Sequence, residues 1–506
     1  MAELITRHWI TPAGLGSSPE TSPESRDSRG SPDYGAYVPD PLVGRAIVLE
    51  GPVAAAVAEA GAALARFTLR VGGPPGFVAS PSLVTPPGLV TPPGLATPPG
   101  LGRWGGGEAV VRVLLRTEAA ASSRLEGLHV DTGRVLRAEA RRRLGRPGRD
   151  QAALMVLGNM DALLYAIDIV GEGVGPSAGP RMAGEGAGPS AGPRMAGEGV
   201  GPSAGPRMAG EGAGLSPELL LEVHRRLLRG TRLESQGGRF RSTQTWIGGS
   251  AADPSSADFA PPPPELVADL VADLCAFCSE GSLPAIAQAA IALAQFEAVR
   301  PFVVGNGRVG RALVHMILLA RGAASRALPP VSLTLAAWAS EYRAALAGTR
   351  YLGPPTSLTA QDGTNLWVGL FAAACTKAVD DASALEQRAG LLERACRTRL
   401  GRVRADSAAD ALLRILPGLP ILTVKDAAEL LGRSTQAANE AVPRLTEAGV
   451  LTQTTVGRRN RAFEAPEVIR SLDDLERGLA GRSRDVRPTL LARGPRSVGP
   501  PQGGTG

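Results

Sequence analysis

The chain has 506 residues, of which 43% are hydrophobic, and its formal net charge at pH 7 is +6. This length predicts two to four domains, and the apolar content excludes a wholly disordered protein. Four cysteines in so long a chain exclude a disulfide scaffold and suit a reducing compartment.

The N-terminus lacks the apolar stretch of a signal peptide, and we find no apolar run of the roughly 18 residues that a membrane span needs. We therefore expect a cytoplasmic protein without a membrane partner.

The N-terminal part of the chain alternates between helical and compositionally biased segments. Residues 1–40 are rich in Ser, Pro, Gly and charge, which predicts a disordered arm. Residues 41–170 form a predicted helical region with helical patterns at 53–70 and 108–140. A spacer at 72–106 contains three copies of Leu-Val/Ala-Thr-Pro-Pro-Gly, and residues 171–214 repeat a Gly/Pro-rich unit. Neither repeat can pack a core, so both are predicted to be spacers.

Residues 215–400 are predicted to form a mainly α domain. Ser216 followed by Pro217 is a helix start, because the serine can cap the helix and proline suits its first position. A further helix is predicted at 265–279, and runs of β-branched residues are few.

The pattern changes at residues 407–470. Helices are predicted at 409–416, 424–431 and 434–448, followed by strands at 450–455 and 461–464. A helix-turn-helix followed by a hairpin is typical of a winged-helix domain. Residues 480–506 are predicted to be a disordered tail.

The segment from Arg300 to Arg311 carries recognisable chemistry. Its Gly305-Asn306-Gly307 turn precedes an apolar helix, so successive backbone N–H groups and the positive helix end can bind an anion. Arg308 and Arg311 are neighbours on the first helical turn, and both can reach a phosphate. The residues alone indicate a phosphate-binding loop, although a turn also needs glycine for folding.

This loop resembles that of the Fic (Fido) family, His-Pro-Phe-x-Asp/Glu-Gly-Asn-Gly-Arg-x-x-Arg. The matching positions are Pro301, Phe302, Gly305, Asn306, Gly307, Arg308 and Arg311. Residues 122–127, Ser-Ser-Arg-Leu-Glu-Gly, resemble the family's inhibitory helix motif, Ser/Thr-x-x-x-Glu-Gly/Asn. Residues 238–248 resemble its flap, and Tyr342 matches a tyrosine that lines the adenine pocket.

The resemblance implies a Fic-type helical core with a small β-hairpin flap, and a protein adenylyltransferase that moves AMP from ATP to hydroxyl side chains of proteins. It assigns nucleotide binding to Gly305, Asn306, Gly307, Arg308, Gly310, Arg311 and Tyr342. It assigns inhibition to Ser122, Glu126 and Gly127, with Glu126 paired to Arg311. Flap residues Gln244, Thr245, Trp246 and Ile247 would dock a protein target by β-augmentation.

Two departures from the family pattern affect catalysis. The family's histidine, the general base, is Arg300 here, and a guanidinium cannot accept a proton near neutral pH. The acidic metal residue is Val304, which offers no oxygen to Mg²⁺. We therefore expect a protein that still binds ATP or phosphate, holds Mg²⁺ poorly and transfers AMP poorly or not at all. A helical scaffold whose loop serves folding alone is the alternative for this segment.

A nucleotide-responsive regulator that acts through the winged helix is the alternative function. Its partner would be double-stranded DNA or another protein, and homodimer formation is a further use of such domains. The candidate DNA contacts are side chains of the second helix and of the wing: Thr435, Gln436, Asn439, Arg458, Arg459 and Arg461.

The remaining candidates favour structural roles. None of the four histidines stands at position 300, and His224 and His315 are expected in the core or on the surface of helices. Glu297 is expected to pair with Arg300, with a role as surrogate base as the alternative. Cys275-x-x-Cys278 lacks a second pair of ligands, which favours structural thiols over zinc or redox chemistry.

Overall fold

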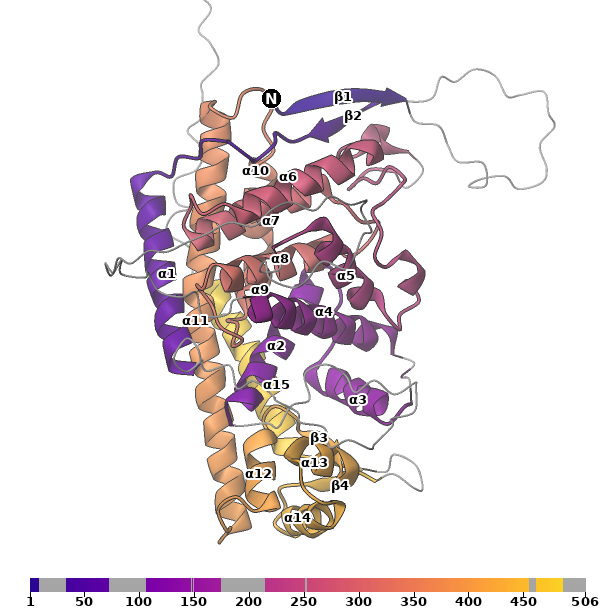
Figure 1. Cartoon of the computed structure of the whole chain (residues 1–506), viewed down its shortest axis with the longest axis vertical. Helices are drawn as coiled ribbons and strands as arrows, with labels where there is room; N and C mark the ends of the chain where they lie inside the picture. The colour runs from indigo at the N-terminus through magenta and orange to yellow at the C-terminus, as the bar shows by residue number, and fades with distance from the viewer. Residues whose placement is uncertain are drawn as a thin grey trace, which may run out of the picture.

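The computed structural model describes residues 1–8, 33–71, 106–146, 148, 150–173, 214–250, 253–454 and 461–485. These residues are mostly helical, which confirms the predicted fold class. The long axis follows α11 (Leu358–Leu400), and α1 (Gly51–Val71) packs along it (Figure 1). The other helices before the C-terminal region are α2 (Gly106–Leu125), α3 (Thr132–Arg143), α4 (Gln151–Gly173), α5 (Pro217–Leu228), α6 (Val267–Ser279), α7 (Ala285–Val299), α8 (Asn306–Ala320), α9 (Val331–Ala337) and α10 (Ala339–Gly348).

Helices α7 and α8 form the centre of the fold. Helix α7 is apolar on nearly every side, as expected for a helix that other helices surround. Gly310 lets the two helices approach, because a Cβ atom there would lie only 2.9 Å from Leu293. This tight packing fixes the position of the connection from Arg300 to Gly305, which carries the predicted site.

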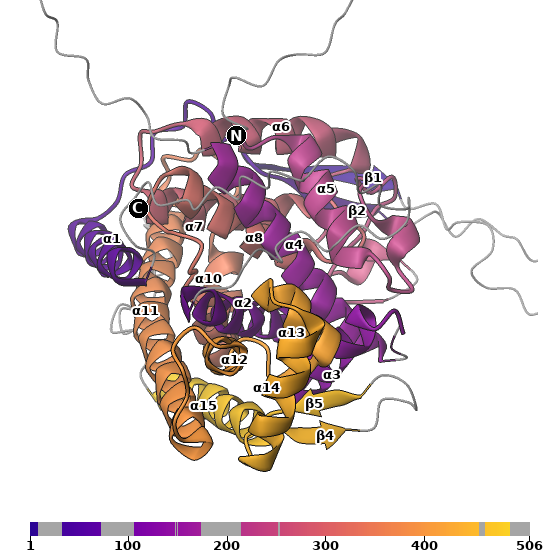
Figure 2. The same ribbon diagram turned by 60° about the horizontal axis from the view of Figure 1, so that its bottom comes forward.

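The C-terminal module comprises residues 408–464. It contains α12 (Ala408–Ile415), α13 (Val424–Leu431) and α14 (Thr435–Glu447), close to their predicted positions. A three-stranded antiparallel sheet has the order β3 (Ile421–Thr423), β5 (Ala462–Glu464), β4 (Thr452–Thr454), and Figure 2 shows it beside α14. Strand β3 was not predicted, because three residues are too few to show a period. The winged-helix interpretation stays a prediction.

Helix α2 joins the C-terminal module to the central helices. The buried Arg116 donates from Nη1 to the Gly418 carbonyl at 3.2 Å. Thr117 donates to Glu476 of α15 (Pro466–Asp485) at 2.6 Å. On its other side, Glu118 accepts from both the backbone N–H and the hydroxyl of Ser332, at the start of α9.

The prediction that residues 1–40 form a disordered arm is wrong at both ends of this segment. Strands β1 (Glu3–His8) and β2 (Asp33–Val38) form an antiparallel hairpin, in which Leu4 faces Tyr37. β-Branched and aromatic residues favour strands here, and the polar composition between them concealed this signal. Residues 9–32 lie outside the described residues.

The prediction that a disordered tail begins at residue 480 is also wrong, because residues 480–485 are helical. Helix α15 buries Leu472 and Leu479, and Trp338 donates to the Ser483 carbonyl at 2.5 Å. The helix therefore extends past the predicted end of the winged helix at 470. The rest of the tail lies outside the described residues.

Two further predictions need adjustment. The predicted helix at 108–140 is two helices, because Gly127 adopts a left-handed φ of 84° and Asp131 caps α3. Helix α4 reaches Gly173, inside the predicted repeat spacer. Residues 72–105 and 174–213, the bulk of both spacers, lie outside the described residues.

Helices α1 and α4 are long and apolar enough to cross a membrane, which corrects the expectation that no such run exists. This is weak evidence for a membrane span, since core helices share these features. Here α1 packs on α11, and α4 packs on α5 and α8.

Candidate functional site

The loop between α7 and α8 has two residues in the left-handed region. Arg300 ends α7 at a φ of 45°, and Gly305 precedes α8 at a φ of 79°. The side chain of Asn306 closes the loop, since its Oδ1 accepts from the Phe302 N–H at 2.8 Å and its Nδ2 donates to the Phe302 carbonyl at 2.7 Å. Asn306 therefore shapes the predicted anion nest.

A carboxylate already occupies the N-terminal end of α8. Glu126 accepts the backbone N–H of Arg308 at 2.8 Å on Oε1 and its side-chain Nε at 2.7 Å on Oε2. Arg308 is 2% exposed and Glu126 24% exposed. The predicted pairing of Glu126 with Arg311 is present but longer, at 3.5 Å.

Ser122 is the main partner of Arg311. The serine hydroxyl accepts from Nε at 2.8 Å, and its carbonyl accepts from Nη2 at 2.7 Å. Burial alone would lower the pKa of Arg311, but Tyr342, Glu126 and Glu297 raise it. The guanidinium is thus held charged by its surroundings.

The predicted adenine-pocket residue, Tyr342, is buried beside this cluster. Burial raises the pKa of its hydroxyl, and the charge of Glu297 adds to the shift. Within the described chain its hydroxyl oxygen has no hydrogen-bond partner of good geometry. Tyr342 therefore presents a neutral polar group to the charged side chains of the loop.

Arg300 pairs with Glu297, as predicted, at 3.3 Å between Nη1 and Oε2. The two side chains form an ion pair with each other. The Arg300 guanidinium has no lone pair with which to accept a proton from a hydroxyl group. Arg300 itself therefore cannot act as a general base.

The position that the family pattern gives to an acidic metal residue is apolar in this structure. Val304 packs its apolar side chain against the hydrophobic core, and the nearby carboxylates Glu126 and Glu297 are engaged by arginines. The described residues include no group of three or more His, Cys, Asp or Glu that could hold a metal ion.

Two residues support the loop through contacts that the sequence reasoning did not assign: His224 of α5, expected only in a structural role, and Arg241, within the segment that resembles the flap. His224 accepts the Gly238 N–H on Nδ1 at 3.2 Å, so Nε2 carries the proton and donates to the Val304 carbonyl at 3.1 Å. Its ring stacks on Phe302 at 3.8 Å between centroids. Burial lowers the pKa of His224 to about 4, which keeps the ring neutral.

Arg241 is the second supporting residue. Its guanidinium donates to the carbonyls of Arg300 at 2.8 Å, Pro262 at 2.5 Å, and Val299 and Thr243 at 3.3 Å each. It therefore ties the end of α7 to the segments on both sides of the flap. Burial lowers the pKa of Arg241 to about 10, which still leaves it charged at neutral pH.

The flap residues lie on the surface near the loop. The predicted β-hairpin is reduced, within the described residues, to one bridge between Ile247 and Phe259. Gln244 donates to the Pro261 carbonyl at 2.8 Å, and the Trp246 indole donates to the Ser250 carbonyl at 2.8 Å. The Ile247 side chain is 38% exposed.

The candidate DNA contacts are only partly described. Thr435, Gln436 and Asn439 are exposed on α14, and Arg461 is exposed at the start of β5. Arg458 and Arg459 lie outside the described residues.

The cysteines and two histidines occupy the core, in line with the structural roles expected. All four cysteines are free and buried, and burial raises the pKa of the Cys275 thiol to about 12. His315 is buried and contacts Glu118 at 3.1 Å.

A helical core that holds a glycine-rich anion loop between two buried helices defines the class of this protein. Residues 214–318 match the Fic/DOC family, so this part of the chain is a Fic/Fido domain.

Among curated proteins, it is similar to protein adenylyltransferase fic-1 of Caenorhabditis briggsae, with 34% identity over 131 residues. The Caenorhabditis elegans fic-1 gives 33% identity over 131 residues. These alignments cover 25% of this chain and 23% of each relative, so less than a quarter of the relatives' length is represented.

Similar solved structures include a Fic family protein from Desulfovibrio desulfuricans, with 19% identity and a TM-score of 0.41. That match covers 83% of this chain and 97% of the other. Fic-1 of C. elegans has 20% identity and a TM-score of 0.35, over 54% of this chain and 63% of the other.

Proposed function

We propose that this Fic domain binds ATP or a related phosphate compound at the end of α8 and transfers AMP to proteins poorly or not at all. The observation that carries the proposal is the Arg300–Glu297 ion pair at the position of the general base. Losing a general base alone lowers a rate by about 10²–10⁴-fold. The similarity to protein adenylyltransferases supports ATP as the ligand.

Glu126 is the proposed inhibitory group. Its carboxylate takes the Arg308 N–H that a phosphate oxygen would use, so anion binding requires its displacement. The proposed protein partner docks along the flap at Gln244–Ile247, where Ile247 is exposed.

A labelling experiment tests this proposal. Purified full-length protein is incubated with α-labelled ATP and Mg²⁺ or Mn²⁺, and protein-bound label is measured for wild type and Glu126→Gly. We expect label only when Glu126→Gly is combined with the repair Arg300→His and Val304→Asp. Glu280→Gly, at the end of α6, is the matched control for loss of a helix-terminal glutamate. Strong labelling by unrepaired Glu126→Gly would overturn the proposal.

DNA binding through the C-terminal module is the second candidate function. Three polar side chains on one helix support it, because Thr435, Gln436 and Asn439 are all exposed on α14. Retention of a double-stranded DNA fragment at low salt, lost in Arg458→Ala/Arg459→Ala, is the expected result. Failure of the wild type to retain DNA at low salt would exclude it.

A further inference from the structure

A cavity of about 270 Å³ lies on the flap side of the fold. The β1–β2 hairpin and the segment 254–260 after the flap form most of its wall, and Arg350 and Leu352 complete it. The Tyr37 N–H donates to the Ala260 carbonyl at 2.8 Å, which joins the hairpin to this segment. Figure 1 shows the hairpin at the same end of the molecule as α6 and α10.

Arg350 is the distinctive group of this cavity. Its guanidinium lies 3.6 Å from the centre of the Phe259 ring, and no ion pair or hydrogen bond of its side chain occurs among the described residues. Burial lowers the pKa of Arg350, and the charge of Arg300 adds to this, while Glu297 opposes it. A guanidinium that stacks on an aromatic ring and has N–H groups without a partner in the protein can bind a carboxylate.

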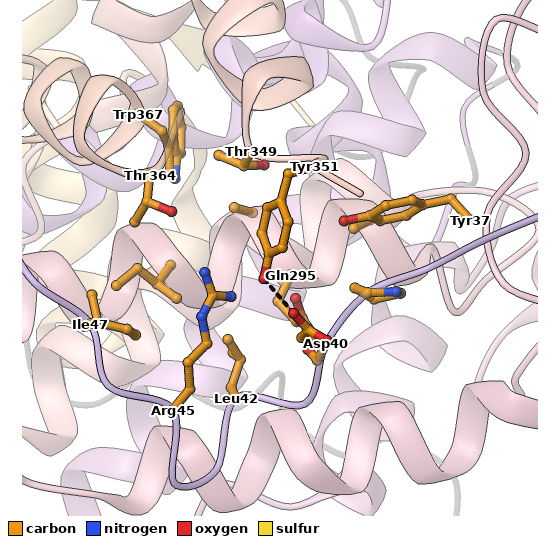
Figure 3. Close-up of a pocket in the computed structure, with 14 residues that line it drawn as sticks. Tyr37, Asp40, Leu42, Arg45, Ile47, Gln295, Thr349, Tyr351, Thr364 and Trp367 are labelled. Atoms are coloured by element: carbon orange, nitrogen blue, oxygen red, sulfur yellow. Dashed lines mark hydrogen bonds between the residues drawn. The ribbon is translucent and has the colours of Figure 1, made fainter. Parts of the chain in front are cut away.

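The neighbouring cavity shows the contrasting case. It measures about 30 Å³ and shares Tyr37 with the larger one. There the acidic residue already has partners within the cavity: the Tyr351 hydroxyl donates to Asp40 at 2.6 Å (Figure 3), and Gln295 donates to the Asp40 carbonyl at 2.8 Å. The larger cavity holds no such internal partner for Arg350.

The mouth of the larger cavity adjoins the flap. Leu4 and Leu352 are more than half exposed at its edge, and Phe259 of its wall is bridged to Ile247. Asp258, the acidic residue of the wall, has its carboxylate against Gly248. An extended segment at the flap can therefore place one side chain in the cavity.

We propose that this cavity receives the acidic side chain, glutamate or aspartate, of the protein segment that docks at the flap. One guanidinium offers a bidentate partner to one carboxylate, while the aromatic and aliphatic walls cover its methylene groups. The proposal deepens the proposed function, since it rests on a protein docking at the flap. It adds a selectivity for the protein partner, at a cavity whose Arg350 lies within electrostatic range of Arg300 and Glu297 of the nucleotide loop.

The test uses a library of N-acetylated heptapeptides, each position randomised, selected on immobilised full-length protein. Wild type is expected to enrich Glu and Asp at one position, and Arg350→Glu is expected to enrich Lys and Arg there instead. Peptides with Gln in place of the selected acid should bind about tenfold to a hundredfold more weakly. Arg343→Glu, on the exposed side of α10, is the matched control and should keep the acidic preference.

A second variant tests the proposal in case Arg350→Glu does not fold. Leu352→Trp fills the mouth of the cavity without changing Arg350, and it should abolish the acidic preference. The absence of acidic enrichment in wild type, including a failure to select any peptide, overturns the inference. Acidic enrichment that Arg350→Glu leaves unchanged, or that ATP competes away, also overturns it.

ATP calorimetry on the same proteins separates this inference from the proposed function. ATP binding without acidic selection refutes the cavity alone. A charge-switched selection without ATP binding refutes the nucleotide proposal alone.

Discussion

Neutralising Glu126 is expected to strengthen ATP binding and weaken the fold at once. Glu126 accepts two charge-assisted hydrogen bonds from Arg308, at 2.8 and 2.7 Å, and an incoming phosphate must replace them. Hydrogen bonds to charged groups contribute about 1.5–3 kcal/mol, and with 24% of the Glu126 side chain in solvent we take about 2 kcal/mol for the carboxylate. This corresponds to about 30-fold tighter binding of ATP by Glu126→Gln.

The same change removes the counter-charge of a buried arginine. Arg308 is 2% exposed, so we expect the free energy of unfolding of Glu126→Gln to fall by about 2 kcal/mol without ligand. Saturating ATP should restore it, because a ligand that binds only the folded state stabilises that state.

Isothermal titration calorimetry with ATP measures the affinity, and urea unfolding with and without ATP measures the stability. Glu280→Gln, far from the loop at the end of α6, should match wild type in both. Equal dissociation constants for wild type and Glu126→Gln would refute the view that the carboxylate occupies the anion site. A variant that loses stability but gains no affinity would show that Glu126 serves the fold alone.

Three further predictions concern pH, backbone conformation and salt. The pKa of His224 is about 4 in the fold against about 6.5 unfolded, so its stabilising contribution is complete above pH 6.5 and is lost as the pH falls toward 4. The loss amounts to roughly 3 kcal/mol, and His224→Gln should flatten this part of the curve of urea-unfolding free energy against pH. Gly305→Ala should lower the free energy of unfolding by about 1–2 kcal/mol, because the φ of Gly305 is 79° and the new Cβ would lie 2.8 Å from Leu227. The control Gly281→Ala, with open space around it, should change the melting temperature little. Any DNA retention should weaken steeply between 50 and 200 mM salt, and a salt-independent interaction would contradict phosphate contacts.

The anion loop was predictable because its chemistry is local. Gly305 and Asn306 lie next to each other in sequence, and a turn before an apolar helix defines its own geometry. The structure confirms the Glu297–Arg300 pair, which lies within one helical turn. What could not be predicted was that Glu126 would prefer Arg308 to Arg311, since that choice depends on how α2 crosses α8.

The missed residues share a physical cause. His224 and Arg241 act on backbone carbonyls, which every residue has, so no sequence pattern marks their targets. The β1–β2 hairpin was missed because its strands are separated by a long polar segment. Strand β3 and the last part of α15 depend on contacts with distant parts of the chain, and such contacts leave little periodic signal.

Removing the residues after α11 would affect helix α2. Its buried Arg116 and Thr117 donate to Gly418 and Glu476, which come after α11 in the chain, and Ser122 on the same helix accepts from Arg311. A shortened protein that ended with α11 would lose both partners, and the side of α2 that the C-terminal residues cover would face water. The residues that match the Fic/DOC family, 214–318, lack α2 as well, so a fragment limited to them would lose the contact between Ser122 and Arg311.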